Sequence, residues 1–416
     1  MTIIHRRKFL SGGVALNAAL SLGMLPSGAL AQGQTIKFLL LTPLSGPNAR
    51  SGALMRKGAE LAVADVNAAG GIAALGGAKL EVVVADAGDS PERAKSAAQR
   101  VLSEEPNLVA GLGAWLSSFT LAATEISERA GLPWMTYSYS DLLTSRGFKH
   151  IYQTAPVASS LATGAIPTVM DIAQQATGKR PTRLAAVADS ALAAQTVMKA
   201  VREQVVSKNG LELVVDETYT PPLTDATSIA QKVRRAKPDL LLLYASTIPD
   251  LKVIIEKFQE FNLGGSQLPL ITIAPQNASP EVIANIKPNL VEGMVVVVGN
   301  WEGLQIKGAA EEMRKRAAEP WLTEDFISTY GQVWLLKDAL ERSKVAEKMA
   351  VSTALRQTDL SGGASAARYF VGGTMKFDDA GRRVASPIVV LQWQNGVPVL
   401  IGPSSDAVAK AIWKKA

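Results

Sequence analysis

The side chains that most often carry out chemistry are scarce in this sequence. It contains no cysteine and two histidines, His5 and His150. His5 lies in a segment that we expect to be removed, which leaves a single imidazole. These counts exclude histidine-dependent catalytic triads, multi-histidine zinc sites, thiolate metal sites and disulfides.

Sequence motifs for nucleotides and metals are also missing. Neither G-x-x-x-x-G-K-[ST] nor G-x-S-x-G occurs, and Leu116 stands where a dinucleotide motif that starts at Gly111 needs its third glycine. Asp86, Asp89 and Glu92 lie close together, but they fit a solvated turn before a helix. We therefore expect no cofactor, no metal and no enzymatic activity.

Polar and aromatic residues instead follow predicted strands, where open parallel sheets bind ligands. Trp115, Ser117 and Ser118 follow one such strand. The two serines begin a predicted helix, so hydroxyl groups and free backbone N–H groups would suit a carboxylate. Capping of the helix by Ser117 is the alternative, and it is compatible with binding.

A second loop reads Tyr137-Ser138-Tyr139-Ser140. If it is extended, the two tyrosines share one face and the two serines share the other. The tyrosines could form a wall for a planar or apolar ligand, while packing in the core or between domains is the alternative.

The elements that must position these loops alternate between apolar strands and amphipathic helices. Ile36 to Thr42 is a nearly continuous apolar run, which is typical of a strand buried on both faces. Further strands of a first parallel sheet are predicted at 80–85, 108–113 and 132–137. Ser90-Pro91 predicts the start of a helix between them.

The same alternation starts again after Pro156. It predicts a second doubly wound sheet with strands at 184–188, 211–215, 239–244 and 268–273, and helices at 195–208, 225–236 and 249–261. The remaining third, with a strand at 293–298, helices at 309–316, 325–342 and 345–357, and strands at 375–377 and 388–393, is too short for another domain. We expect it to return to the first two lobes.

The bulk composition agrees with two globular lobes. The chain has 416 residues, of which 47% are hydrophobic and 19% are charged. Its formal charge of +6 includes Arg6, Arg7 and Lys8 near the start. The other basic residues are scattered and are not interleaved with aromatic residues, so we expect no nucleic-acid partner.

The first 31 residues have the pattern of an export signal. Arg6-Arg7 precede Phe9-Leu10 and an apolar stretch from Val14 to Leu25, which is too short to span a bilayer. Ala29-Leu30-Ala31 is a small-residue cleavage site. We interpret 1–31 as a twin-arginine signal peptide that is cleaved near Ala31, with a general secretory signal as the alternative. The expected location is the periplasm.

A family resemblance emerges from several ordered segments. The mature chain resembles the branched-chain amino-acid-binding family of type I periplasmic binding proteins, which are the receptors of ABC importers. The segments that carry the resemblance run from Leu41 to Asn48, Leu61 to Ile72, Lys79 to Pro91, Gly131 to Thr144, Asp216 to Tyr219 and Met375 to Arg382.

The resemblance implies an α/β fold of two doubly wound parallel-sheet lobes joined by a three-crossover hinge. It implies an N-terminal lobe of 35–155 plus 278–384, a C-terminal lobe of 156–274 plus 385–416, and a ligand cleft between them. The crossovers are expected near Ala155-Pro156, Ala274 to Asn277 and Arg383 to Ser386. The implied partners are a small organic ligand and an ABC permease in the inner membrane, and the protein is expected to be a monomer.

The resemblance also implies where the ligand binds. The first-lobe candidates are Trp115, Ser117, Tyr137, Ser138 and Tyr139, and the second-lobe and hinge candidates are Ser246, Thr247 and Gln276.

Departures from the family pattern bear on the ligand. Relatives hold an α-ammonium group with two acids, which Ala158 and Gln276 replace here, and Leu192 stands where an aromatic residue is usual. A buried ammonium without a counter-charge is costly. The preferred ligand is therefore an aromatic or aliphatic carboxylate, or an amide, without a free α-ammonium group. The alternatives are a branched-chain amino acid, with Asp141 as a substitute acid, and a sensory binding module for a receptor kinase or chemoreceptor.

Overall fold

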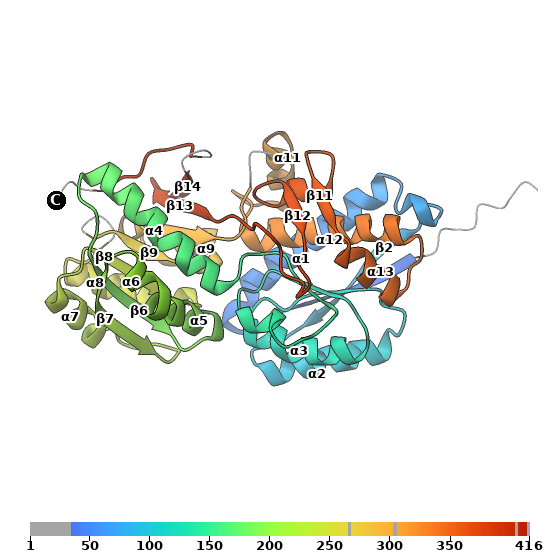
Figure 1. Ribbon diagram of the computed structural model, residues 1–416, viewed down its shortest axis with the longest axis horizontal. Helices are drawn as coiled ribbons and strands as arrows, with labels where there is room; N and C mark the ends of the chain where they lie inside the picture. Colours follow the sequence, from blue (N-terminus) through green and yellow to red (C-terminus); the bar gives the residue numbers. More distant parts are fainter. Residues whose placement is uncertain (1–34, 265–267, 303–305, 404–406, 414–416) are drawn as a thin grey trace, which may run out of the picture.

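The structure, a computed structural model, describes residues 35–264, 268–302, 306–403 and 407–413. Two α/β lobes lie side by side, and several chain segments cross between them (Figure 1). The expected signal peptide and its cleavage site near Ala31 lie outside the described residues.

The first lobe is built on a parallel sheet, as predicted, but the sheet has five strands where four were expected. Phe38, Leu39, Leu40 and Leu41 are completely buried, which explains why their strand reads as a continuous apolar run. The strand order is β2 (Lys79–Asp86), β1 (Thr35–Thr42), β3 (Gly111–Gly113), β4 (Trp134–Thr136) and β5 (Ile151–Gln153).

Helices from two distant parts of the sequence cover this sheet. Ser90 caps the helix that starts at Pro91 by accepting a hydrogen bond from the N–H of Arg93 at 3.2 Å, as its sequence position predicts. The helices are α1 (Ala49–Ala68), α2 (Pro91–Glu104), α3 (Ser117–Arg129), α11 (Lys307–Ala317), α12 (Glu324–Ser343) and α13 (Lys348–Arg356). Because α12 packs along α1, the first lobe needs a late part of the chain.

The second lobe is built on a seven-stranded mixed sheet. Its order is β14 (Val397–Gly402), β13 (Val389–Gln394), β10 (Val295–Val298), β9 (Leu270–Thr272), β8 (Leu240–Tyr244), β6 (Arg183–Asp189) and β7 (Glu212–Tyr219). The strands from β10 to β7 are parallel, whereas β13 and β14 are antiparallel to their neighbours.

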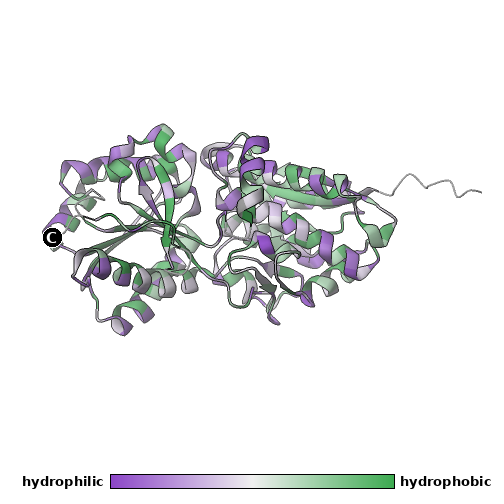
Figure 2. Cartoon of the chain, turned by 90° about the horizontal axis from the view of Figure 1, so that it is seen from above, coloured by the Kyte–Doolittle hydropathy of each residue, from purple (hydrophilic) through white to green (hydrophobic). Residues whose placement is uncertain are grey.

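The helices of the second lobe include a long one that the sequence reasoning did not identify, α4. They are α4 (Ala158–Thr177), α5 (Leu192–Ala200), which continues as a π-helical turn into α6 (Val206–Lys208), α7 (Thr227–Ala236), α8 (Ile248–Glu260), α9 (Pro280–Asn285) and α10 (Pro288–Val291). Apolar strands lie between helices that carry the polar residues outward (Figure 2).

One expected boundary is wrong. We expected the chain to cross back to the first lobe near 274–277, with residues 278–384 belonging to that lobe. Instead β10 pairs with β9 and β13 in the second sheet, so the chain leaves that sheet only after Val298. The four valines from Val295 to Val298 are completely buried. A run of valines would fit the buried interior of either sheet, so only the pairing with other strands shows to which lobe this strand belongs.

Two smaller features complete the fold. Strands β11 (Asp359–Ser361) and β12 (Thr374–Lys376) form an antiparallel pair outside both sheets. Within the described ranges, no helix has the length and apolar character needed to cross a membrane.

Candidate functional site

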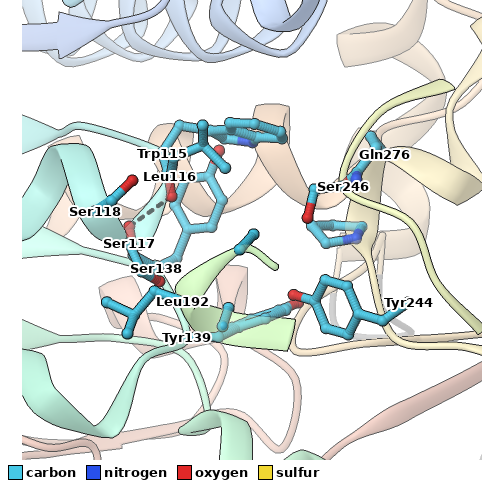
Figure 3. A pocket seen from close by; sticks show the side chains of 14 residues that line it. Trp115, Leu116, Ser117, Ser118, Ser138, Tyr139, Leu192, Tyr244, Ser246 and Gln276 are labelled. Carbon is cyan, nitrogen blue, oxygen red and sulfur yellow. Dashed lines mark hydrogen bonds between the residues drawn. The ribbon is translucent and has the colours of Figure 1, made fainter. Parts of the chain in front are cut away.

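A pocket lies where the two lobes face each other. It encloses about 490 Å³ that protein atoms do not fill, part of it open to solvent. Its lining residues are Trp115, Leu116, Ser117, Ser118, Tyr137, Ser138, Tyr139, Ala191, Leu192, Ala193, Tyr244, Ser246, Pro275 and Gln276. In Figure 3, Trp115, Ser117 and Ser118 lie opposite Tyr244, Ser246 and Gln276.

The pocket brings together seven of the eight residues that the sequence singled out. Leu192, the predicted replacement of an aromatic residue, also lines it. Thr247 is the exception. Its hydroxyl accepts a hydrogen bond from the N–H of Asp250 at 3.3 Å and caps α8. The side chain that the sequence suggested as a ligand contact is therefore the N-cap of a helix.

Two helices begin at the pocket without a side-chain cap. The N-cap residues of α3 and α5 are Leu116 and Ala191, and neither makes a capping hydrogen bond. The first amides of a helix have no partner within the helix and carry a partial positive charge. One helix N-terminus from each lobe therefore points these amides toward the same space, where an anion would be stabilised.

Ser117 contributes a hydroxyl at the start of α3. It does not cap the helix, because the cap position belongs to Leu116. Its oxygen accepts a hydrogen bond from the N–H of Ser140 at 3.1 Å. This contact fixes the hydroxyl and leaves its proton free to be donated.

Ser138 lines the pocket but uses its hydroxyl inside the protein. Its O–H donates to the carbonyl of Trp115 at 2.6 Å, and its oxygen lies 2.8 Å from the hydroxyl oxygen of Thr120. The same hydroxyl receives a bond from Thr136 at 3.0 Å. Ser138 therefore shapes the loop that ends β3, and we withdraw it as a polar ligand contact.

Two second-lobe loops are held together by one buried carboxylate. Asp189 accepts hydrogen bonds from the N–H groups of Ala191 at 2.9 Å and of Ser246 at 2.6 Å. Burial raises the pKa of Asp189, although these hydrogen bonds lower it in part. Gln276 donates to the carbonyl of Ala245 at 3.0 Å, which orients its amide beside the same loop.

The pocket contains no charged side chain. Among the described residues that line it, none is Asp, Glu, His, Lys or Arg. Ala158 is completely buried and lies outside the lining, and its N–H donates to the carbonyl of Tyr139 at 2.6 Å. Asp141, the possible substitute acid, accepts the N–H of Ser159 at 3.1 Å near the start of α4. An ammonium group in this pocket would find no carboxylate on its walls.

Two acids that the sequence reasoning missed lie directly behind the pocket. Glu324 and Asp325 begin α12 and are 0% and 1% exposed. They accept hydrogen bonds from the aromatic side chains at 115, 137 and 139. Two adjacent acids at a predicted helix start were visible in the sequence, but nothing local indicated that they would meet loops about 190 residues away.

Burial dominates the ionisation of this network. It raises the pKa of Glu324 to about 8 and that of Asp325 to about 6, although hydrogen bonds from their aromatic partners oppose the change. Burial and the neighbouring carboxylates also raise the pKa values of Tyr137 and Tyr139 well above the usual range. Both phenols therefore keep their protons near neutral pH.

Comparison with known proteins gives a consistent result. A sequence model of the family described as periplasmic binding protein matches residues 35–412. A "Leu/Ile/Val-binding protein homolog 7" of Brucella melitensis biotype 1 is 26% identical over 402 residues, which cover 94% of this chain and 97% of that protein.

Solved structures show the same fold. The isoleucine complex of the branched-chain amino acid transporter substrate-binding protein LivJ from Streptococcus pneumoniae has a TM-score of 0.74 and 20% identity, covering 88% of this chain and 100% of the other. A solute-binding protein of an ABC transporter from R. palustris in complex with benzoate has a TM-score of 0.73 and 19% identity, covering 91% and 99%.

Proposed function

Because this chain belongs to the branched-chain amino-acid-binding family of type I periplasmic binding proteins, we propose that it is the solute receptor of an ABC importer for small organic carboxylates. Members of this family are solute-binding proteins and not enzymes, and we extend that property to this chain. The proposed cycle is closure of the two lobes over one ligand, followed by docking of the closed form on a permease. The proposed location is the periplasm, and the proposed state is a monomer.

One observation carries the ligand assignment: two uncapped helix N-termini meet in a pocket that has no charged side chain among its lining residues. A carboxylate gains from both helix ends and from the hydroxyl of Ser117. An α-ammonium group on the same ligand would have to lose its water without gaining a carboxylate partner, at a cost of several kcal/mol.

The remainder of the pocket suits an apolar or aromatic group. Trp115, Tyr137 and Tyr139 present large rings on the first-lobe side, and Leu192 and Tyr244 add apolar surface from the second lobe. The benzoate complex of the R. palustris protein supports this ligand class, because that protein shares the fold. An aromatic carboxylate without an ammonium group is therefore the preferred cargo.

A branched-chain amino acid is the second candidate. It is favoured by the names of the Brucella relatives and by the isoleucine complex of the Streptococcus protein. It requires an ammonium partner that Ala158, Gln276 and Asp141 do not supply from the pocket walls.

Isothermal titration calorimetry on protein freed of bound ligand distinguishes the candidates. Benzoate, benzamide, leucine and isoleucine form the panel. We expect benzoate to bind at least about tenfold more tightly than leucine, which corresponds to about 1.4 kcal/mol. Benzamide separates the need for a negative charge from the need for a ring. Tight binding of leucine with no response to benzoate would show that the proposed ligand class is wrong.

A further inference from the structure

The aromatic wall of the pocket is tied to the acid pair on α12. We use "aromatic wall" for Trp115, Tyr137 and Tyr139, and "acid pair" for Glu324 and Asp325. One oxygen of Asp325 accepts the indole N–H of Trp115 at 2.9 Å and the phenol O–H of Tyr137 at 2.9 Å. Glu324 accepts the O–H of Tyr139. All three polar protons of the wall are therefore directed at the acid pair.

This arrangement limits what the wall offers a ligand. An indole or a phenol has one polar proton, and a hydrogen bond to the ionised carboxylate of Asp325 is stronger than a neutral one. The phenol oxygen of Tyr139 also accepts the N–H of Gly299 at 3.0 Å, so it is occupied as an acceptor too. The aromatic rings line the pocket while their polar atoms point away from it.

The backbone at Trp115 shows that this orientation is imposed. Its φ angle is 74°, in the left-handed region that bulky residues rarely adopt. Two contacts hold it there: Ser138 donates to its carbonyl at 2.6 Å, and Asp325 accepts its indole N–H. Such conformations persist only where the surroundings determine them, and they cluster at ligand sites.

We propose that Asp325 and Glu324 are positioning residues that determine specificity: by accepting the polar protons of Trp115, Tyr137 and Tyr139, they turn the ring faces toward the ligand. The wall then selects ligands with a flat or apolar portion over ligands that need a hydrogen bond at that position. This inference deepens the proposed function and takes its ligand class from it.

The first experiment compares Tyr137→Phe with Tyr137→Leu, using benzoate as the titrated probe. Phenylalanine keeps the ring and removes the hydroxyl, so we expect affinity within about threefold of the wild type. Leucine removes the ring, so we expect a loss of more than about tenfold. A loss of more than tenfold with phenylalanine in both the single variant and Tyr137→Phe/Asp325→Asn would overturn the proposal, because the hydroxyl would then be binding the ligand.

The second experiment replaces the acid. Asparagine at 325 keeps an acceptor oxygen for both donors, whereas alanine removes it. We expect Asp325→Asn to bind benzoate within about fivefold of the wild type and Asp325→Ala to lose more than about tenfold. Asp338→Ala is the matched control, because Asp338 lies on the same helix and pairs with the partly exposed Arg342. A folded Asp325→Ala variant with wild-type affinity would contradict the proposed role.

These outcomes can be separated from failure of the proposed function. If the wild type ignores benzoate and binds leucine, the ligand class is wrong, and the same variants are then titrated with leucine. If neither compound binds, the positioning role is tested without ligand, by the melting temperatures of Tyr137→Phe, Asp325→Asn and the double variant. If the double variant loses less melting temperature than the two single variants together, the hydrogen bond between Tyr137 and Asp325 is supported. If the losses in melting temperature add up, the proposal is overturned.

Discussion

At the scale of single residues, Ser117 combines two contributions to the cleft. Its hydroxyl keeps a proton to donate, and its backbone N–H is the first of α3. Alanine removes the hydroxyl, and with it the hydrogen bond from the N–H of Ser140, but it keeps the backbone N–H because the helix start does not depend on this side chain for its cap. The two contributions can therefore be separated by mutation.

We predict that Ser117→Ala weakens benzoate binding by about tenfold, as expected for loss of one hydrogen bond to a charged group. Calorimetric titration gives the dissociation constant. Ser103→Ala is the matched control, because Ser103 is exposed near the end of α2 in the same lobe. Wild-type affinity in Ser117→Ala would place the carboxylate elsewhere in the pocket.

The raised pKa of Glu324 predicts a pH dependence of stability. Its folded-state pKa of about 8 lies above the ordinary value of 4.5, so the folded protein binds the proton more tightly than the unfolded chain does. The resulting stabilisation is fully present below about pH 4.5 and is lost as the pH rises toward about 8. Each unit of difference between the two pKa values corresponds to about 1.4 kcal/mol.

We therefore predict that Glu324→Gln loses less thermal stability than the wild type between about pH 5 and pH 8. Glutamine cannot ionise but can still accept the N–H of Gly299. Melting curves of both proteins across this range measure the difference, and titrating groups that do not interact with Glu324 cancel because they are common to both. Parallel pH profiles would show that Glu324 ionises with its ordinary pKa.

Sequence reasoning found the lining of the pocket more readily than the groups behind it. Ser117 and Tyr139 follow predicted strands, and in an open parallel sheet ligands bind at the carboxyl ends of the strands. Glu324 and Asp325 reach the site only because α12 packs along α1 in the first lobe. That contact joins distant parts of the chain, and no local pattern encodes it.

At the scale of elements, the helix starts around the pocket are of two kinds. α8 is capped by the hydroxyl of Thr247, whereas α3 and α5 have no side-chain cap. This difference explains why the serine and threonine after β8 play different parts: Ser246 lines the pocket and Thr247 completes a helix.

We predict that Thr247→Ala lowers the free energy of unfolding by about 1 kcal/mol, the usual cost of losing an N-cap, and leaves benzoate affinity within about twofold. Chemical denaturation and calorimetry measure the two quantities. Thr353→Ala is the control, because Thr353 is exposed on α13. A tenfold loss of affinity would return Thr247 to the ligand site.

The sheet elements show where local patterns stop being informative. Apart from β5, the parallel strands of both lobes were predicted from apolar runs. The short strand β5 was missed, because its three residues give no periodic signal. The strand β10 was predicted as an element but was placed in the wrong lobe, because its side chains are equally suited to either sheet.

At the scale of the whole molecule, an ion pair joins the two lobes. Arg50 near the start of α1 contacts Glu281 on α9, and it also binds Glu319 at 2.6 Å. The side chains of Arg50 and Glu281 are 34% and 26% exposed, so the pair between them contributes at most about 1 kcal/mol. Separation of the lobes would break this contact.

We predict that Glu281→Gln weakens benzoate binding by up to about fivefold, because it removes a contact that favours closely placed lobes. The effect should shrink at high salt, which screens the wild-type pair. Glu60→Gln is the matched control, because its exposed pair with Arg56 lies within α1. Equal affinities at low salt would show that the pair does not bias closure.

The path of the chain through both lobes has a consequence for biosynthesis. The first lobe lacks α12 and α13 until residue 356 has been made, and the second lobe lacks its last two strands until residue 402. Neither lobe can therefore finish folding while the ribosome is still translating the middle of the chain. Nascent chains stalled near residue 300 should therefore expose to chaperones the surface of α1 that α12 covers in the folded protein.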